Sequence, residues 1–103
     1  MSIIHVTSEN YAREVLGSGK TVLLDFSAVW CGPCRMIAPY LEQIAEERED
    51  VKVCKIDVDE SPDLAAQYRV VSIPTLVVLR DGKIVTQSVG AMPKNEILAL
   101  LER

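Results

Sequence analysis

The pattern with the clearest chemistry is Trp-Cys-Gly-Pro-Cys at residues 30–34, between an apolar run and a helical pattern. Residues three apart on a helix are surface neighbours about 5–6 Å apart, and a disulfide joins Cα atoms roughly 4.4–6.8 Å apart. A helix N-terminus also stabilises a thiolate, because its unpaired N–H groups carry about half a positive charge. Cys31 and Cys34 can therefore alternate between a dithiol and a disulfide, and we interpret the segment as a redox centre.

Metal binding is the alternative interpretation of two cysteines at this spacing. A structural zinc site normally has four ligands, and the remaining cysteine and histidine, Cys54 and His5, are not at metal-ligand spacing. We therefore favour redox chemistry and expect no metal. Cys54 is expected to be buried and inert, and His5 to lie at the surface or at a sheet edge.

A carboxylate, Asp25, interrupts the apolar run at residues 22–28. Such a run is typical of a strand buried on both faces, where desolvation would raise the pKa of Asp25 and let it pass protons near neutrality. An aspartate facing solvent at a strand end is equally compatible with the sequence. Lys55 follows Cys54 in a later predicted strand, so the two side chains point to opposite faces. By alternation alone, Lys55 is an ordinary lysine that reaches for water.

The elements that must position these residues alternate between strand and helix. Apolar alternation and apolar runs predict strands over residues 3–6, 22–28, 51–58, 75–79 and 84–89. Helices are predicted after Thr7, after Cys31, after Ser61 and from about Pro93. The Asp-Gly pair at 81–82 indicates a tight hairpin between the last two strands. This order predicts an α/β fold with a mixed sheet and helices on both of its faces.

Periodicity also predicts which helical positions are buried. The first helix, with Thr7 as its N-cap, is expected to bury Ala12, Val15 and Leu16. In the second helix the pattern places Cys34 on the buried face and Cys31 a turn earlier, near the tip. One sulfur should therefore be more accessible than the other.

The totals describe an ordinary globular chain. Its 103 residues fit one domain spanning 1–103, and 49% of them are hydrophobic. A net charge of −4 argues against a nucleic-acid partner. No apolar run approaches the about 18 residues that span a bilayer, and the N-terminus lacks a secretory pattern. The odd number of cysteines, three, also argues against a secreted scaffold held by disulfides. We therefore expect a cytoplasmic protein without a membrane partner.

With these elements in place, the chain resembles the thioredoxin family over almost its entire length. The matching pieces are Asp25-Phe26, Ala28, residues 30–34, residues 36–39, Lys55, residues 73–75, Gly82 and residues 89–91. The Trp-Cys-Gly-Pro-Cys motif, followed about forty residues later by Ile-Pro-Thr, is highly specific. The resemblance implies the thioredoxin fold, a central five-stranded mixed sheet flanked by four helices. Ser27 stands where many members have a large aromatic residue, and Val29 where a polar residue is common.

The resemblance also implies the roles of three catalytic residues. Cys31 would attack a target disulfide and form a mixed disulfide, and Cys34 would then attack Cys31 and release the reduced target. Asp25 would accept the proton of Cys34. Lys55 would tune this carboxylate, and Gly32 and Pro33 would modulate the cysteine pair that they separate.

Further residues are implied to bind the target around Cys31. Trp30, Ile73, Pro74, Gly90 and Ala91 would form an apolar patch there, with Pro74 also modulating the site. The resemblance implies a cis peptide bond between Ile73 and Pro74, although the sequence alone favours the trans form. A cis bond would leave the Ile73 backbone free to pair with an extended target segment.

These expectations add up to a general protein-disulfide reductase that carries two electrons and needs no bound cofactor. Its partners would be disulfide-containing target proteins and a thioredoxin reductase, an NADPH-dependent flavoprotein, and it would act as a monomer. An oxidase or isomerase is a second hypothesis, but such relatives usually carry a histidine between the cysteines, where this chain has Gly32 and Pro33. A binding subunit that does not use its cysteines is a third.

Overall fold

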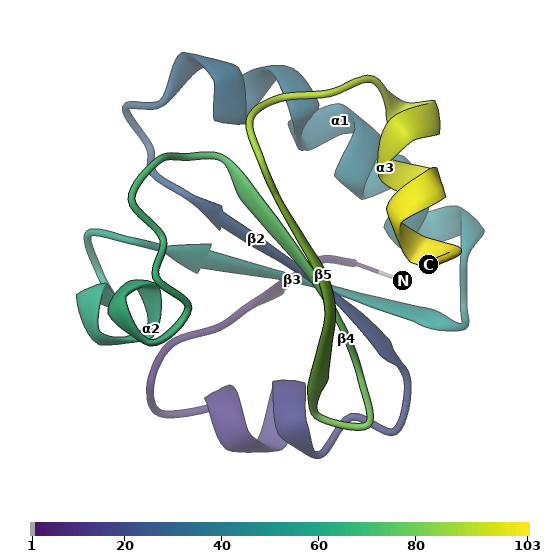
Figure 1. Cartoon of the computed structure of the whole chain (residues 1–103), viewed down its shortest axis with the longest axis horizontal. Helices are drawn as coiled ribbons and strands as arrows, with labels where there is room; N and C mark the ends of the chain where they lie inside the picture. The colour runs from purple at the N-terminus through teal and green to yellow at the C-terminus, as the bar shows by residue number, and fades with distance from the viewer. Residues whose placement is uncertain (1) are drawn as a thin grey trace.

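Within residues 2–103, the part of the chain that the computed structural model describes, a central sheet lies between two layers of helices (Figure 1). The strands are β1 (Ile4–His5), β2 (Thr21–Ser27), β3 (Val51–Asp57), β4 (Thr75–Arg80) and β5 (Lys83–Val89). The helices are η1 (Ala12–Leu16), α1 (Gly32–Glu47), α2 (Pro62–Gln67) and α3 (Lys94–Leu101). The predicted five-stranded mixed sheet with four helices is therefore confirmed.

The strand β2 lies at the centre of the sheet. The strand order is β1-β3-β2-β4-β5, with parallel pairing between β1, β3 and β2 and antiparallel pairing from β2 through β4 to β5. Residues 22–27 are all buried. A strand that is covered on both faces has no reason to alternate, which explains the apolar run in the sequence.

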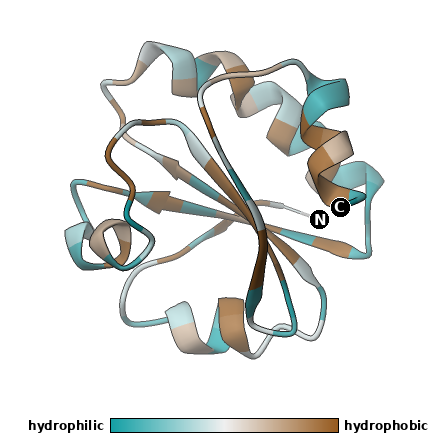
Figure 2. Ribbon diagram, viewed as in Figure 1, coloured by the Kyte–Doolittle hydropathy of each residue, from teal (hydrophilic) through white to brown (hydrophobic). Residues whose placement is uncertain are grey.

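Two hydrophobic cores, one on each side of the sheet, hold the helices in place. Leu23 faces α1 and α3 and packs with Ile37 and Ile97, whereas Leu24 and Phe26 face η1 and α2. Figure 2 shows hydrophobic residues along the central strands, whereas hydrophobic and hydrophilic residues follow one another along the helices. Because successive residues of a strand point to opposite faces, β2 contributes to both cores at once.

The first helix begins later than predicted. Residues 8–10 form a turn in which the Thr7 hydroxyl accepts the backbone N–H of Glu9 at 3.3 Å, and the helix itself starts at residue 12. The expected burial of Val15 is confirmed, but that of Ala12 and Leu16 is wrong, because Tyr11 faces the core together with Val15. Tyr11 packs edge-on against Tyr68 of the segment after α2, with their hydroxyl groups in contact, and this long-range packing sets the buried face.

The predicted hairpin joins β4 and β5 at the end of the sheet opposite the N-terminus of α1 (Figure 1). Asp81 and Gly82 both adopt positive φ angles, 53° and 76°. Two consecutive left-handed residues are what a two-residue type I′ turn requires.

We expect the Gly82→Ala variant to be less stable by about 1 kcal/mol, because the left-handed backbone disfavours a side chain. A Cβ atom at Gly82 would lie 3.8 Å from Leu16 Cδ2, an ordinary van der Waals contact, so the cost is conformational and not steric. Urea unfolding would measure it. Asp81→Gly is the matched control and should leave stability unchanged or raise it. An unaltered midpoint for Gly82→Ala would contradict this account of the turn.

Candidate active site

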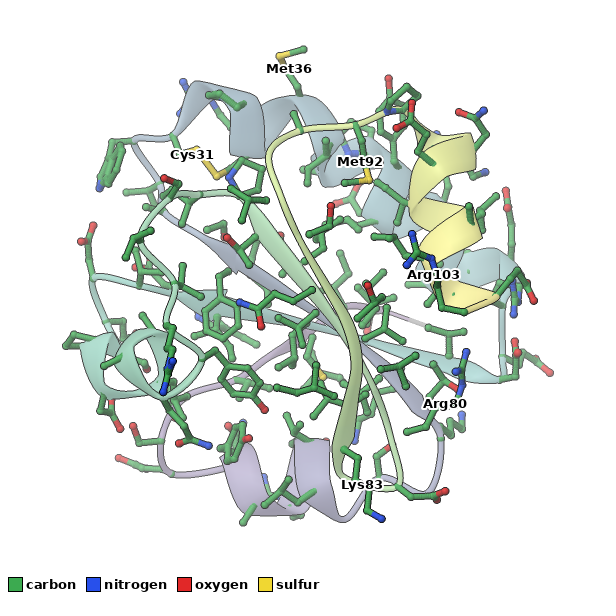
Figure 3. The ribbon with its side chains drawn as sticks, viewed as in Figure 1. Cys31, Met36, Arg80, Lys83, Met92 and Arg103 are labelled. Atoms are coloured by element: carbon green, nitrogen blue, oxygen red, sulfur yellow. A yellow bond between two sulfur atoms is a disulfide. The ribbon has the colours of Figure 1, made fainter. Side chains whose placement is uncertain are left out.

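The two cysteines of the motif form a disulfide at the N-terminus of α1, visible as the yellow bond beside the Cys31 label in Figure 3. Their Cα atoms are 5.3 Å apart. Cys31 is the N-cap residue, and its sulfur accepts the backbone N–H of Cys34 at 3.2 Å. Gly32 and Pro33 form the exposed first turn, where the missing N–H of proline would have no helical partner in any case. The short turn thus holds both sulfurs at bonding distance.

The disulfide is covered by neighbouring apolar residues. Cys31 is 4% exposed and Cys34 is 5% exposed, so the expectation that Cys31 is the more accessible residue is wrong for this oxidised form. The pair packs with Ala28, and the half-buried side chains of Val58 and Ile73 close over it. The covering residues come from other strands and loops, so helical periodicity could not reveal them.

Asp25 is the buried carboxylate that the sequence left undecided between the core and the solvent. It is 1% exposed, and neither carboxylate oxygen has a hydrogen-bond partner among the described residues. Burial raises the pKa of Asp25 to about 6, and the charge of Lys55 works in the opposite direction. Lys55 is its direct neighbour in the parallel pairing of β2 and β3, so both side chains face α1.

A cavity of about 320 Å³ opens beside Cys34 on the same face of the sheet. Its lining includes Ser27, two residues beyond Asp25, together with Lys55 and Asp57. Ser27 is buried, and its small side chain borders the cavity. His5 is exposed, as expected, lies at the cavity, and is 3.1 Å from Glu60.

Two loops meet the cysteine pair from the side of β4. The Ile73–Pro74 peptide bond is cis, as the resemblance implied. The Ile73 carbonyl oxygen lies 3.9 Å from the Cys31 sulfur, and the backbone N–H of Gly90 donates to the Pro74 carbonyl at 2.8 Å. Gly90 has a φ of 102°, which favours glycine. This bond ties the loop that carries Ala91, which is exposed, to the cis-proline loop.

Trp30 is a surface residue and not a core anchor. It is 64% exposed, and its indole N–H donates to the Asp59 carboxylate at 2.7 Å. The sequence analysis did not identify Asp59. The two residues are 29 positions apart, and only the contact between the end of β2 and the turn after β3 brings them together.

Comparison with known proteins agrees with this geometry: the family model described as "Thioredoxin" matches residues 2–103. The chain belongs to the thioredoxin family. It is 52% identical over 96 residues to thioredoxin of Mycobacterium tuberculosis, covering 92% of this chain and 83% of that protein. It is 49% identical over 92 residues to thioredoxin of Chlorobaculum thiosulfatiphilum, covering 88% and 85%. It is 48% identical over 99 residues to thioredoxin 1 of Synechococcus elongatus, covering 95% and 92%.

Thioredoxins are oxidoreductases that act by dithiol–disulfide exchange, and this member holds the cysteine pair which that reaction uses. The chain is therefore a thiol–disulfide reductase whose targets are proteins that contain disulfides, as the motif predicted. Among residues 2–103, no three His, Cys, Asp or Glu side chains are grouped so as to hold a metal ion.

No helix in this part of the thioredoxin chain is both long enough and apolar enough to cross a membrane.

Cys54 lies apart from the redox pair of this thioredoxin, on the opposite face of the sheet. It is 0% exposed and packs in the core beside η1 and α2, which confirms its expected burial. Burial raises the pKa of its thiol to about 11. A thiol that is neither ionised nor accessible is a poor nucleophile.

We expect replacement of Asp25 by asparagine to stabilise the protein increasingly as pH rises from about 4 to about 7. The pKa of the carboxyl is 3.8 by default and about 6 in the fold, so the folded state binds more protons between these values. The free energy of unfolding of the wild type therefore falls by about 3 kcal/mol in all across that interval, and it does not change further at higher pH. The variant lacks this loss.

Urea unfolding of both proteins between pH 4 and pH 8 would measure the difference. Ser27→Ala changes a non-titrating neighbour on the same strand face, so its effect should not vary with pH. If the free energies of unfolding of Asp25→Asn and wild type differed by the same amount at every pH, ionisation of the Asp25 carboxyl would not destabilise the fold, and this account would be wrong.

Proposed function

We propose that this thioredoxin is a general protein-disulfide reductase, with Cys31 as the nucleophile. From the dithiol form, the Cys31 thiolate attacks a target disulfide, forms a mixed disulfide and releases one target thiolate. Cys34 then attacks the Cys31 sulfur, releases the second target thiolate and leaves the Cys31–Cys34 disulfide. Two electrons pass from the protein to the target. The observation that carries this proposal is the disulfide at the N-terminus of α1.

Asp25 is proposed to take the proton of Cys34 before the second attack. Its support is a pKa of about 6, which lets a carboxyl both accept and return a proton near neutrality. Cys34 and Lys55, the neighbour of Asp25 in the strand register, line one cavity, and the proton would pass between Cys34 and Asp25 by way of water there. Lys55 is proposed to tune this carboxylate, since its charge favours the ionised form.

The target is proposed to bind across Trp30, Ile73, Pro74, Gly90 and Ala91. Apart from the 3.9 Å contact of its carbonyl with the Cys31 sulfur, the Ile73 backbone has no hydrogen bond to another backbone group among the described residues. Its N–H and C=O groups can therefore pair with an extended target segment as a short added strand. The exposed ring of Trp30 offers apolar area next to Cys31. Contacts of this kind suit many sequences, as a general reductase requires.

Gly32, Pro33 and Pro74 are proposed to modulate the pair. Gly32 and Pro33 supply no ionisable group between the cysteines, which supports a reductant over an oxidase. Pro74 presents no side-chain donor or charge beside the sulfurs.

The protein is proposed to work as a cytoplasmic monomer, with residues 1–103 as a single domain. A thioredoxin reductase, a flavoprotein that draws electrons from NADPH, is proposed to return the disulfide to the dithiol. No bound cofactor is needed, because the two sulfurs themselves store the electrons.

We expect Cys31→Ser to abolish the reduction of insulin disulfides, because the attacking thiolate is gone. Cys34→Ser should still attack but should accumulate mixed disulfides with its targets, which mass spectrometry of the captured complexes would reveal. Cys54→Ala is the matched control and should retain activity, since Cys54 lies on the other face of the sheet. A Cys34→Ser protein that captures nothing and turns over normally would refute these roles.

A further inference from the structure

An apolar pocket of about 240 Å³ lies beside the helix that carries the redox pair. Its lining comes from one side of α1 and from the segment between β5 and α3: Met36, Ile37, Tyr40, Ala91, Met92 and Pro93. We call these six residues the methionine pocket. None of them carries a charge, and Met36 is 68% exposed. Figure 3 shows Met36 projecting from α1 and Met92 on the loop that runs beside that helix.

The methionine pocket is continuous with the surface proposed to bind targets. Ala91 belongs to both, and Ile37 lies one helical turn after Cys34. Any protein whose sulfur bonds to Cys31 must cover the surroundings of that sulfur. The chain of the target therefore passes near the pocket if it runs along α1.

The geometry points to a specific occupant, and this inference rests on the proposed reductase function. We propose that the methionine pocket receives one large apolar side chain, a leucine, methionine or phenylalanine, from an extended target segment. An apolar cavity of about 150 Å³ is enough to hold benzene, so the pocket has room for such a side chain. Burying a charged side chain there would be costly, because no lining residue carries an opposite charge.

The distance along α1 indicates which target residue reaches the pocket. A helix rises about 1.5 Å per residue, so Met36 and Tyr40 lie about 7.5 Å and about 13.5 Å beyond Cys31. An extended chain advances about 3.3 Å per residue. The occupant is thus about two to four residues from the target cysteine.

Two methionines make the pocket adaptable. Methionine is unbranched and polarisable, and it adjusts its shape to different apolar partners. The pocket therefore selects for apolar character and size without selecting one residue type, which is consistent with a reductase of many proteins.

The test uses peptides that carry one cysteine in disulfide linkage to thionitrobenzoate, whose release is followed by absorbance. Leucine, glycine or glutamate is placed two, three or four residues from the cysteine, on either side. For the wild type we expect kcat/KM to be about tenfold higher for leucine than for glycine at one or more of these positions, and lowest for glutamate.

Substitution of Met36 should remove this preference. In Met36→Glu and in the uncharged Met36→Gln, the leucine-to-glycine ratio should fall to near unity, and Met36→Leu should restore it. Ile84→Glu is the matched control, because Ile84 is also an exposed apolar residue, 55% exposed, but lies at the hairpin end of β5. Its ratio should equal that of the wild type.

The possible failures are distinguishable. Equal reduction of all peptides by the wild type, or a preference that survives both polar substitutions of Met36, would overturn the pocket while leaving the reductase proposal intact. If the wild type reduced none of the peptides, both proposals would fall.

Discussion

The position of the redox pair depends on one constraint, the burial of β2 between two neighbouring strands and two helical layers. Because β2 is hydrogen-bonded on both sides and covered on both faces, its end cannot shift without disturbing both cores. The backbone N–H of Val58 donates to the Ser27 carbonyl at 2.9 Å, and this bond continues the pairing to the last residue of the strand. Five residues later the chain enters α1, whose inner face is packed into the core by Ile37 and Leu41. The backbone on both sides of the cysteines is therefore fixed, and the disulfide between Cys31 and Cys34 can form with little backbone motion.

The same burial creates a conflict at Asp25. An apolar residue at this position would satisfy the core, whereas a carboxylate loses its hydration and finds no hydrogen-bond donor among the described residues. Lys55 lies beside it in register but does not offset the desolvation. Such local disagreements between fold and residue type are expected at functional sites, where a perturbed proton affinity is useful. In this chain the conflict sits on the face that holds Cys34 and its cavity.

Much of the fold was readable from local patterns because those patterns report single elements. The apolar run predicted β2, Asp81 and Gly82 predicted the hairpin, and the cysteine spacing predicted the redox pair. The features that sequence reasoning missed depend on contacts between distant segments. Periodicity assigned Ala12 and Leu16 to the core, but the packing of Tyr11 against Tyr68 decided otherwise.

The same limit applied to the site. Helical spacing placed Cys31 at the tip but could not show that Ile73 and Val58 close over the disulfide. The sequence does not decide whether Asp25 is buried, because the pairing of β2 with β3 and β4 joins segments that are distant in the chain. Asp59 follows no motif at all, since only the meeting of two turns brings its carboxylate to the indole of Trp30.

The seclusion of Cys54 has a practical consequence for handling the molecule. Cys54 is 0% exposed and burial raises the pKa of its thiol to about 11, so under native conditions an alkylating reagent should spare it, and any labelling of the reduced protein should report on the active-site pair. The third sulfur responds only when the interior opens. The rate at which Cys54 is modified therefore measures how often the fold opens, and no engineered probe is needed for that measurement.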